Sequence, residues 1–596
     1  MSSRHFTPAE EQVRAILHDG STFPTGEQER VILHDGCAFV AACPGAGKTR
    51  VLVERARILL NDRTAGKAVA FLSFTNAAVS ELGRRLQQEG LLPSPAFPHF
   101  MGTFDSFLWQ FLVAPFGIPG CSSSPRLIPD KEKRTVRPSG ECRPMPLECF
   151  DRATGQIKLA VATRLSFDPD RNPGLTRAYA ASAASARQRF LLRGELDFDD
   201  ARALAADRLK DAALSSKLAT ALAGRFREVI VDEAQDCNPA DLEIIQWLRG
   251  TGIATKVVCD PHQSIYEFRG GVTDQLIAFG ETFDPNDRLS LSDNFRSSDP
   301  ICKAIVALRP PGPKVRPDSA LGPHRTITTP VHILAYQGRR VPDTIGAKFR
   351  ELVEAEGFDL VRCPVLAATR QSGARAIGQP DEASTLDLTL RLANAVTSFH
   401  FAFETGNRKE ALEEVHRVIL AIEGRMDTKT YHQYLAAEGI EPSSWRPRVL
   451  KLVRELRYAP STYPNPDAWH VRAKALLEPH LLDGGRSINQ ILRRNVGLAN
   501  ALAVAPASNP PAKTIHSVKG MEFPAVCVVM TAATAKGILD YLQTGVPTEC
   551  SEDARKIYVA VSRAQRLLAI ATPKSQAARL EGLLAATGAP VSLLYL

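Results

Sequence analysis

The chain has 596 residues, a formal net charge of +8, and hydrophobic residues at 44% of its positions. This length is too great for one hydrophobic core, so we expect three or four domains. The composition is that of an ordinary globular protein, which excludes a fibrous or fully disordered chain. The small positive surplus favours an anionic partner such as nucleic acid, although a surplus of this size is also common on ordinary protein surfaces.

Cysteines and apolar runs indicate the cellular compartment. Eleven cysteines are scattered along the chain without a CxxC pair, which favours neither a zinc site nor a disulfide framework. The first residues lack the apolar segment of a signal peptide, and no apolar run approaches about 18 residues. We therefore expect a cytoplasmic protein with reduced thiols and no membrane association.

The sequence predicts a phosphate-binding loop between a short apolar run and a helix. The run at 37–41 leads into Ala42-Cys43-Pro44-Gly45-Ala46-Gly47-Lys48-Thr49, and apolar residues then recur at helical spacing. The glycines let successive N–H groups face inward, and the helix N-terminus adds a positive partial charge. We expect Lys48 to reach the β- and γ-phosphates of a nucleotide and Thr49 to hold Mg²⁺. The alternative is a glycine-rich turn that binds nothing, since Ala42 replaces the first glycine of the usual pattern.

A second motif for phosphate chemistry follows the β-branched run at 228–231. Asp232 and Glu233 come directly after this expected strand, so one carboxylate would lie at Mg²⁺ and the next could polarise water. Acids at a strand end can also be merely solvated, but the phosphate loop upstream argues against this alternative. Further along, Gln263 precedes Phe268 and Arg269, a spacing suited to linking a γ-phosphate sensor to a grip on nucleic acid.

Two segments place a hydroxyl beside an aromatic ring. Phe74 and Thr75 follow an apolar run, and Thr103 and Phe104 repeat the pattern. Hydroxyls bind phosphates and exposed aromatic rings stack on bases, so both pairs suit a track for a single nucleic-acid strand. The alternative is that these aromatic residues belong to the hydrophobic core.

Composition also indicates two inserted segments. Residues 116–200 begin as a polar linker with clustered proline and serine, and continue as alanine-rich amphipathic stretches. Residues 380–505 are again helical in pattern and rich in charge. We interpret both as mostly helical insertions. Apolar strands are expected at 68–74, 228–231, 364–370, 526–529 and 567–570.

In this order, the motifs resemble those of the UvrD/Rep/PcrA-like branch of superfamily 1 DNA helicases. The most specific matches lie at 231–236, 263–270, 514–523 and 558–564, and the resemblance extends from Gln28 to Arg563. It implies an α/β fold with two RecA-like P-loop NTPase cores, built on parallel sheets flanked by helices, each with a mostly helical inserted subdomain. The implied domains are 1–115 and 201–285 for the first core, 116–200 for its insertion, 286–379 and 506–596 for the second core, and 380–505 for its short, divergent insertion.

The resemblance further implies that ATP and Mg²⁺ bind between the cores. The implied catalytic residues are Lys48, Glu233, Gln263, Arg296 and Arg563, with the two arginines acting as arginine fingers. Nucleotide would contact Gln28, Ala42, Cys43, Pro44, Gly45, Ala46, Gly47, Lys48, Thr49, Arg50, Phe295 and Glu522, with Gln28 reading the adenine base. Mg²⁺ would be held by Thr49 and Asp232. DNA would contact Phe74, Thr75, Thr103, Phe104, Tyr266, Phe268, Arg269 and His516.

Some positions depart from the family pattern. Asp105 stands where a histidine is common, Phe295 replaces a tyrosine, and a Gly-Phe-Phe-Glu-Arg-type motif is missing after Arg370. We expect an ATP-dependent single-stranded DNA translocase and 3′→5′ helicase that acts on single-stranded and duplex DNA in repair or replication restart. The alternative is a helicase subunit of a Gabija-type anti-phage defence complex with a partner nuclease. The compact size, the divergent second insertion and the short stretch after Arg563 favour this alternative.

Overall fold

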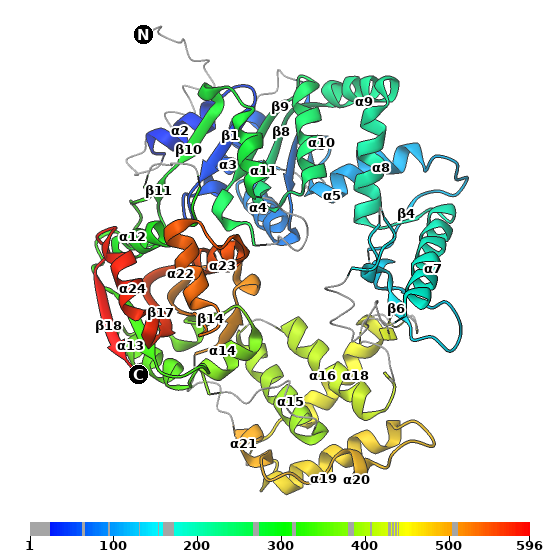
Figure 1. Ribbon diagram of the computed structural model, residues 1–596, viewed down its shortest axis with the longest axis vertical. Coiled ribbons are helices and arrows are strands. Elements are labelled where there is room, and N and C mark those ends of the chain that lie inside the picture. The colour runs from blue at the N-terminus through cyan, green and yellow to red at the C-terminus, as the bar shows by residue number, and fades with distance from the viewer. Residues whose placement is uncertain are drawn as a thin grey trace.

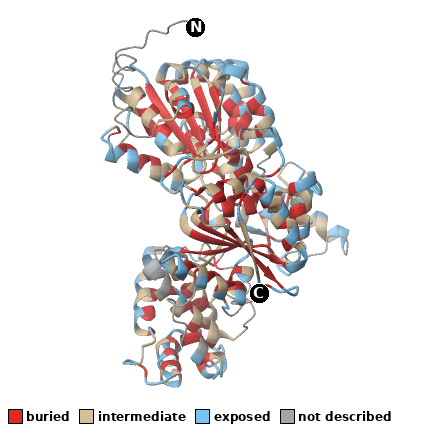
Figure 2. Ribbon diagram, turned by 90° about the vertical axis from the view of Figure 1, so that its left-hand side faces the viewer, coloured by how far each residue is buried: buried red, intermediate tan, exposed pale blue. Residues whose placement is uncertain are grey.

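The computed structural model describes residues 24–596, apart from 62–65, 93–95, 130, 153, 159–171, 266–272, 313–316, 379–386, 406–407, 427–430, 460, 504–509 and scattered positions between 432 and 441. Two parallel sheets of six strands each form the centres of two α/β cores (Figure 1). Their strands are mostly buried because helices cover both faces (Figure 2). The expected two-core α/β fold is confirmed.

The first sheet holds the predicted phosphate loop and the predicted acids. Its strands are β1 (Ala38–Ala42), β2 (Ala68–Ser73), β3 (Phe100–Thr103), β8 (Phe226–Asp232), β9 (Ala254–Cys259) and β10 (Arg288–Leu291), in the order β10-β1-β9-β8-β2-β3. One face packs on α3 (Lys48–Asn61) and α4 (Asn76–Gln88). The other packs on α10 (Pro239–Gly250) and α11 (Thr273–Glu281). The carboxyl ends of β1, β8 and β9 therefore meet at one edge of the sheet.

Strand β10 belongs to the first sheet, contrary to the expected domain boundary at residue 286. Leu291 of β10 pairs with Ala42 of β1 in parallel register. Every strand of the first sheet ends by Leu291 and every strand of the second begins at or after Val331. The chain therefore passes from one sheet to the other once, between these two residues.

The second sheet has the order β15-β14-β16-β17-β13-β18. The strands are β13 (Val331–Tyr336), β14 (Val365–Ala367), β15 (Ala512–Thr514), β16 (Phe523–Val529), β17 (Ala564–Pro573) and β18 (Val591–Tyr595). Neither β13 nor β18 was expected from the sequence. One face is covered by α12 (Asp299–Ala307), α22 (Ala535–Thr544), α23 (Ser551–Val561) and α24 (Lys574–Ala585). The other is covered by α13 (Thr344–Ala355) and α14 (Arg370–Ala376).

The two insertions differ in character. The described part of the first contains one long helix, α7 (Pro173–Leu192), and two small sheets made of β4 (Arg126–Leu127) with β7 (Glu195–Leu196), and β5 (Thr135–Val136) with β6 (Met145–Pro146). It is less helical than expected, because the stretch before α7 is rich in proline and glycine, which interrupt helices. Most of its first alanine-rich stretch, residues 158–165, lies outside the described residues.

The second insertion is helical, as expected, and lies at the bottom of Figure 1. Its larger helices are α15 (Leu388–Thr405), α16 (Arg408–Ile422), α18 (Pro442–Glu455) and α19 (Pro466–Leu477), with the short α20 (Ile488–Ile491) and α21 (Leu498–Ala503). These helices enclose a separate core that includes Trp445 and Trp469. Among the helices that the structure describes, none is long and apolar enough to cross a membrane.

Candidate functional site

The predicted phosphate loop connects the end of β1 to the start of α3. Gly45 and Gly47 have φ angles of +76° and +75°, a left-handed backbone that glycine adopts without a steric penalty. Lys48 is the first residue of α3, so its backbone and that of Thr49 lie at the positive end of the helix dipole. The loop therefore has the backbone form and the cationic side chain that suit a bound phosphate.

The predicted acids follow β8 at the same edge of the sheet. Glu233 is the only non-glycine residue with positive φ in the described part of the chain, at 57°. Its N–H donates to Asp232 Oδ1 at 2.9 Å, and the Gln235 side-chain amide donates to its carboxylate. A costly backbone conformation held by two hydrogen bonds fixes the direction of the Glu233 side chain.

The electrostatics differ between these two acids. Burial, together with the neighbouring Glu233 charge, raises the pKa of Asp232. Burial alone would also raise the pKa of Glu233, but the positive charges of Lys48 and Lys519 hold it below its usual value. Glu233 is therefore ionised at neutral pH, as a general base must be.

Gln263 lies in a chain of hydrogen bonds that joins the two cores. Asp260 Oδ2 accepts a hydrogen bond from Gln263 Nε2 at 2.8 Å, and Gln263 Oε1 accepts one from Arg563 Nη2 at 2.9 Å. Asp260 Oδ2 also lies 3.4 Å from the hydroxyl of Tyr558 in α23. Asp260, which the sequence analysis did not single out, fixes the amide of Gln263. Burial and the charge of Arg296 lower the pKa of Arg563 to about 9.

Arg296, the second predicted finger, is held by its side chain and by its backbone. Its Nε donates to Glu522 at 2.8 Å and its Nη1 to the carbonyl of Ser562 at 3.0 Å. Its N–H donates to Asn294 Oδ1 at 2.8 Å. The structure thus brings together Arg296, Arg563 and Glu522, which the sequence placed in one site.

Phe295 lies against the phosphate loop. Its N–H donates to the carbonyl of Gly45 at 2.9 Å. A Cβ added to Gly322 would lie 2.0 Å from the Phe295 carbonyl oxygen, so no larger residue fits there without movement of the backbone. The Phe295 backbone is therefore hydrogen-bonded to the loop and packed tightly against Gly322.

Gln28, predicted to read adenine, contacts the loop directly. Its side chain is almost fully buried, and its Nε2 donates to the carbonyl of Ala46 at 3.0 Å. Its Oε1 accepts the N–H of Thr25 at 3.0 Å as part of the cap of α2 (Gly26–Leu33). In this arrangement Gln28 supports the loop, and its contact with a base stays a prediction.

The predicted strand contacts divide into exposed and buried residues. Phe74 is partly exposed and stacks on Phe104, with ring centroids 5.2 Å apart. Phe104 itself is fully buried in the core of the first domain, so its prediction as a DNA contact is wrong and it supports Phe74 instead. Thr75 and Thr103 are partly exposed and cap α4 and α5 (Phe104–Phe107). These three exposed residues remain candidates for a strand contact.

Other residues of the predicted strand track lie further along the chain. His516 Nε2 is 3.1 Å from the carbonyl of Ile265, a contact between the cores. Tyr266, Phe268 and Arg269 lie outside the described residues. Asp105, the acid that departs from the family pattern, pairs with Arg202 at 2.5 Å. Its charge is therefore balanced within the protein.

An ion pair that the sequence analysis missed also joins the cores. Lys519 Nζ lies 2.5 and 2.7 Å from the two carboxylate oxygens of Asp236, and both side chains are largely buried. Lys519 lies in the motif at 514–523 and Asp236 in the motif at 231–236. Their spacing in those motifs gave no sign that they meet.

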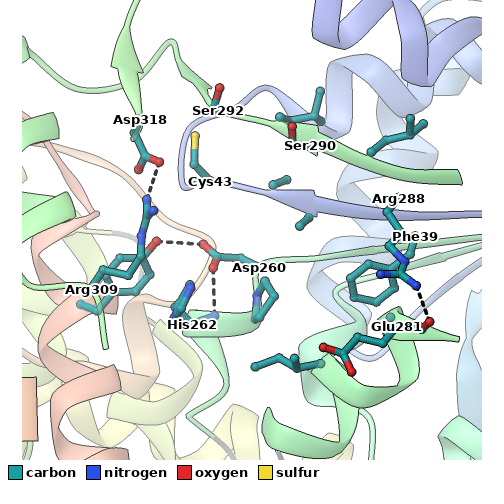
Figure 3. Close-up of a pocket in the computed structure, with 18 residues that line it drawn as sticks. Phe39, Cys43, Asp260, His262, Glu281, Arg288, Ser290, Ser292, Arg309 and Asp318 are labelled. Carbon is teal, nitrogen blue, oxygen red and sulfur yellow. Dashed lines mark hydrogen bonds and ion pairs between the residues drawn. The ribbon is translucent and has the colours of Figure 1, made fainter. Parts of the chain in front are cut away.

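A cavity of about 450 Å³ adjoins the start of the loop (Figure 3). Its apolar wall comes from β1, β10 and α11, including Phe39, Ala42 and Leu289. Its polar end combines residues of both cores: Asp260, His262, Arg309, Asp318 and Tyr558. Arg309 pairs with Asp318 there, and burial lowers the pKa of His262 to about 4. The cavity shows that the loop is bordered by both cores.

Comparison with known proteins matches this geometry to a family. The model of the UvrD/REP helicase N-terminal domain matches residues 25–136 and 148–284, and that of the UvrD-like helicase C-terminal domain matches 485–575. ATP-dependent DNA helicase UvrD1 of Mycobacterium tuberculosis is 26% identical over 312 residues, which cover 49% of this chain and 38% of that protein. ATP-dependent DNA helicase PcrA of Staphylococcus aureus is 26% identical over 273 residues, covering 44% and 37%.

These matches cover about two-fifths of the length of those relatives. The two family models together match most of the first core and the later part of the second, including the loop, the acids and Arg563. The chain belongs to the UvrD/Rep/PcrA-like family of helicases.

Proposed function

We propose that this chain hydrolyses ATP with Mg²⁺ and uses the cycle to move 3′→5′ along single-stranded DNA, unwinding duplex DNA in repair or replication restart. One observation carries the proposal. Arg563 of the second core reaches Gln263 of the first at 2.9 Å, beside the acids and the phosphate loop. If hydrolysis needs residues from both cores, its rate depends on how close the two cores are to each other.

The residues of the loop edge fit both the nucleotide and the metal. Lys48 and the N-terminus of α3 supply positive charge for phosphates. The Thr49 hydroxyl and the Asp232 carboxylate are oxygen ligands, which Mg²⁺ prefers. Bound Mg²⁺ would neutralise charge on the β- and γ-phosphates. Glu233 would orient or deprotonate the attacking water.

The arginines supply the remaining charge. In this proposal Arg296 and Arg563 stabilise negative charge that develops on the γ-phosphate, while Gln263 senses that phosphate. Arginine fingers contribute on the order of 10³ to 10⁵ in rate. Loss of the γ-phosphate would remove the anion that holds both arginines near the first core, so the cores would separate after hydrolysis.

The strand contacts of the proposal lie on both cores. Phe74, Thr75 and Thr103 lie on the first core, and His516 lies on the second. Relative movement of the cores would therefore change the spacing between contacts along one strand, which is how hydrolysis would drive stepping. Tyr266, Phe268 and Arg269 complete the proposed track.

Two measurements test the proposal. ATP hydrolysis should rise when a single-stranded DNA oligonucleotide is added, and an unchanged rate in a preparation that binds ATP would contradict the coupling. For polarity, the chain should displace streptavidin from the 5′ end of a biotinylated oligonucleotide faster than from the 3′ end. Faster displacement from the 3′ end would reverse the proposed direction.

A second candidate function is that of a helicase subunit in a Gabija-type anti-phage defence complex with a partner nuclease. It is supported by the gap between the family matches, since residues 285–484 fall outside both models. A divergent second insertion would suit contact with a partner protein. Co-purification with a nuclease encoded beside its gene, and a change of ATPase rate on mixing, would favour this candidate over free unwinding.

A further inference from the structure

Ser73, the last residue of β2, carries a buried hydroxyl without a partner. The residue is only 3% exposed, and its Oγ makes no hydrogen bond in the structure. An unsatisfied buried hydroxyl destabilises a fold, whereas alanine would fill most of the same space at no such cost. The hydroxyl therefore needs an explanation outside the packing of the core.

The position of Ser73 supplies one. In the parallel pairing of β2 with β8, Ser73 lies directly opposite Asp232. Side chains alternate between the two faces of a sheet, and Phe71 and Ile230, two residues earlier on each strand, pack in the core beneath α3. Ser73 and Asp232 therefore share the face covered by the helix that starts at Lys48.

The neighbouring acids do not use the Ser73 hydroxyl. Asp232 Oδ1 accepts the N–H of Glu233, and the Glu233 carboxylate accepts the amide of Gln235. The hydroxyl is thus an unused hydrogen-bonding group one strand away from the acids proposed to hold Mg²⁺ and to activate water.

Ser73 also borders the proposed strand track. The next residues are Phe74, stacked on Phe104, and Thr75, whose hydroxyl accepts the N–H of Ala78 to cap α4. Ser73 is therefore adjacent in sequence to the residues proposed to contact the strand. A shift of the backbone at Phe74 and Thr75 on strand binding would move Ser73 relative to Asp232.

We propose that Ser73 is a positioning residue, whose hydroxyl hydrogen-bonds water held at Asp232 and Glu233 once nucleotide is bound, and which transmits strand binding at Phe74 and Thr75 to that water. The inference rests on the proposed function, because it needs MgATP at the loop. It assigns a role in hydrolysis to an uncharged residue of β2. It also predicts a signature that a packing role would not produce.

The test uses the full chain with Ser73→Ala and three measurements. The melting temperature without ligand should stay unchanged or rise, because an unpartnered buried hydroxyl is removed. The rise in melting temperature caused by Mg²⁺ and ATPγS should shrink by about half. The rate of ATP hydrolysis stimulated by single-stranded DNA should fall roughly tenfold. Ser73→Thr keeps the hydroxyl and should recover most of both losses.

Thr572→Val is the matched control. Thr572 is also fully buried at the end of a strand, β17 of the second core, and its Oγ1 also lacks a partner. This variant should match Ser73→Ala in melting temperature without ligand but keep the ATPγS shift and the stimulated rate of the unaltered chain. Equal effects of the two variants on those readouts would overturn the inference.

Two further outcomes separate the inference from the proposed function. If the unaltered chain shows the ATPγS shift and Ser73→Ala shows the same shift and rate, the inference alone is overturned. If Ser73→Ala lowers the melting temperature without ligand yet keeps the ATPγS shift, Ser73 is a packing residue and the inference is again overturned. An unaltered chain with no shift would overturn nucleotide binding and the inference together.

Discussion

Arg563 and Gln263 are 300 residues apart in sequence, yet Arg563 Nη2 donates to Gln263 Oε1 at 2.9 Å. Arg563 also donates to the carbonyls of Val559 and Met521, so its guanidinium is anchored in the second core. Gln263 is anchored in the first core by Asp260. Protein contacts within each core therefore fix the directions of both side chains, which favours a preorganised contact with a γ-phosphate.

Arg563→Ala should lower ATP hydrolysis roughly 10³-fold or more, as expected for a lost arginine finger. Nucleotide affinity should fall only modestly, because Lys48 and the loop are untouched. Single-turnover hydrolysis, nucleotide affinity and melting temperature measured on one preparation check this. Arg579→Ala is the control, since Arg579 pairs with Asp540 in the second core away from the loop. Full hydrolysis with a lowered melting temperature would show that Arg563 only packs.

Glu233→Gln should lower turnover by at least about two orders of magnitude while keeping binding of ATP and DNA, since it removes the base but preserves shape. The contact with Gln235 can persist after reorientation of one amide, so the left-handed turn should survive. Rapid-quench hydrolysis and fluorescent-nucleotide binding check this. Asp207→Asn, which changes an exposed carboxylate on α8 (Phe198–Lys210), is the control. Near-normal turnover in Glu233→Gln would refute its role as base.

Lys519→Met should shift the acidic limb of the pH–rate profile to higher pH. The Lys519 charge helps to hold the pKa of Glu233 down. Its removal raises that pKa, so the carboxylate is protonated, and hydrolysis is lost, at a higher pH. The kcat for ATP measured across pH checks this.

Lys519→Met also leaves the buried Asp236 carboxylate without this ion-pair partner. Combining it with Asp236→Asn therefore separates the loss of the ion pair from the loss of the Lys519 charge near Glu233. The double variant should regain stability but keep the shifted profile. Lys536→Met, at an exposed position of α22, should change neither. An unshifted acidic limb in Lys519→Met would contradict the electrostatic role.

Gly322→Ala should raise the KM for ATP about tenfold, a difference of roughly 1.4 kcal/mol. A Cβ at this position would lie 2.0 Å from the carbonyl oxygen and 2.4 Å from the carbonyl carbon of Phe295. The backbone at Phe295, which is hydrogen-bonded to the phosphate loop, must therefore move. Gly582→Ala in α24 is the control, because its Cβ would meet nothing within 4 Å. An unchanged KM in Gly322→Ala would contradict the dependence of the nucleotide site on Phe295.

The sequence predicts the loop and the acids well because their chemistry requires particular residues at fixed spacing. The predicted order of strand, glycine turn and helix is what the structure has at Ala42–Lys48, and Asp232 ends β8. Contacts across the cores could not be predicted in the same way. Lys519 and Asp236 are 283 residues apart, and only the tertiary fold brings them together.

The failures of prediction have local physical causes. β10 reads Arg-Leu-Ser-Leu with alternating exposure, which is typical of an edge strand and does not tell which sheet it joins. Phe104 follows a hydroxyl, as a strand-contacting aromatic residue would, but burial rather than sequence decides whether a ring is available. From the sequence alone, the Asp105 carboxylate would be unfavourable near a nucleic-acid phosphate. The structure shows that Arg202, 97 residues away in sequence, pairs with it.

The single passage of the chain between the sheets has a mechanical consequence. It leaves β10, crosses the phosphate loop where Cys43 N–H donates to the carbonyl of Leu291 and Phe295 N–H to that of Gly45, and then enters the second core. A rigid body that turns about a tether moves least at the tether and most at its far side. The proposed nucleotide site therefore lies near the pivot, so a small change around a bound γ-phosphate would become a larger displacement at elements far from the loop.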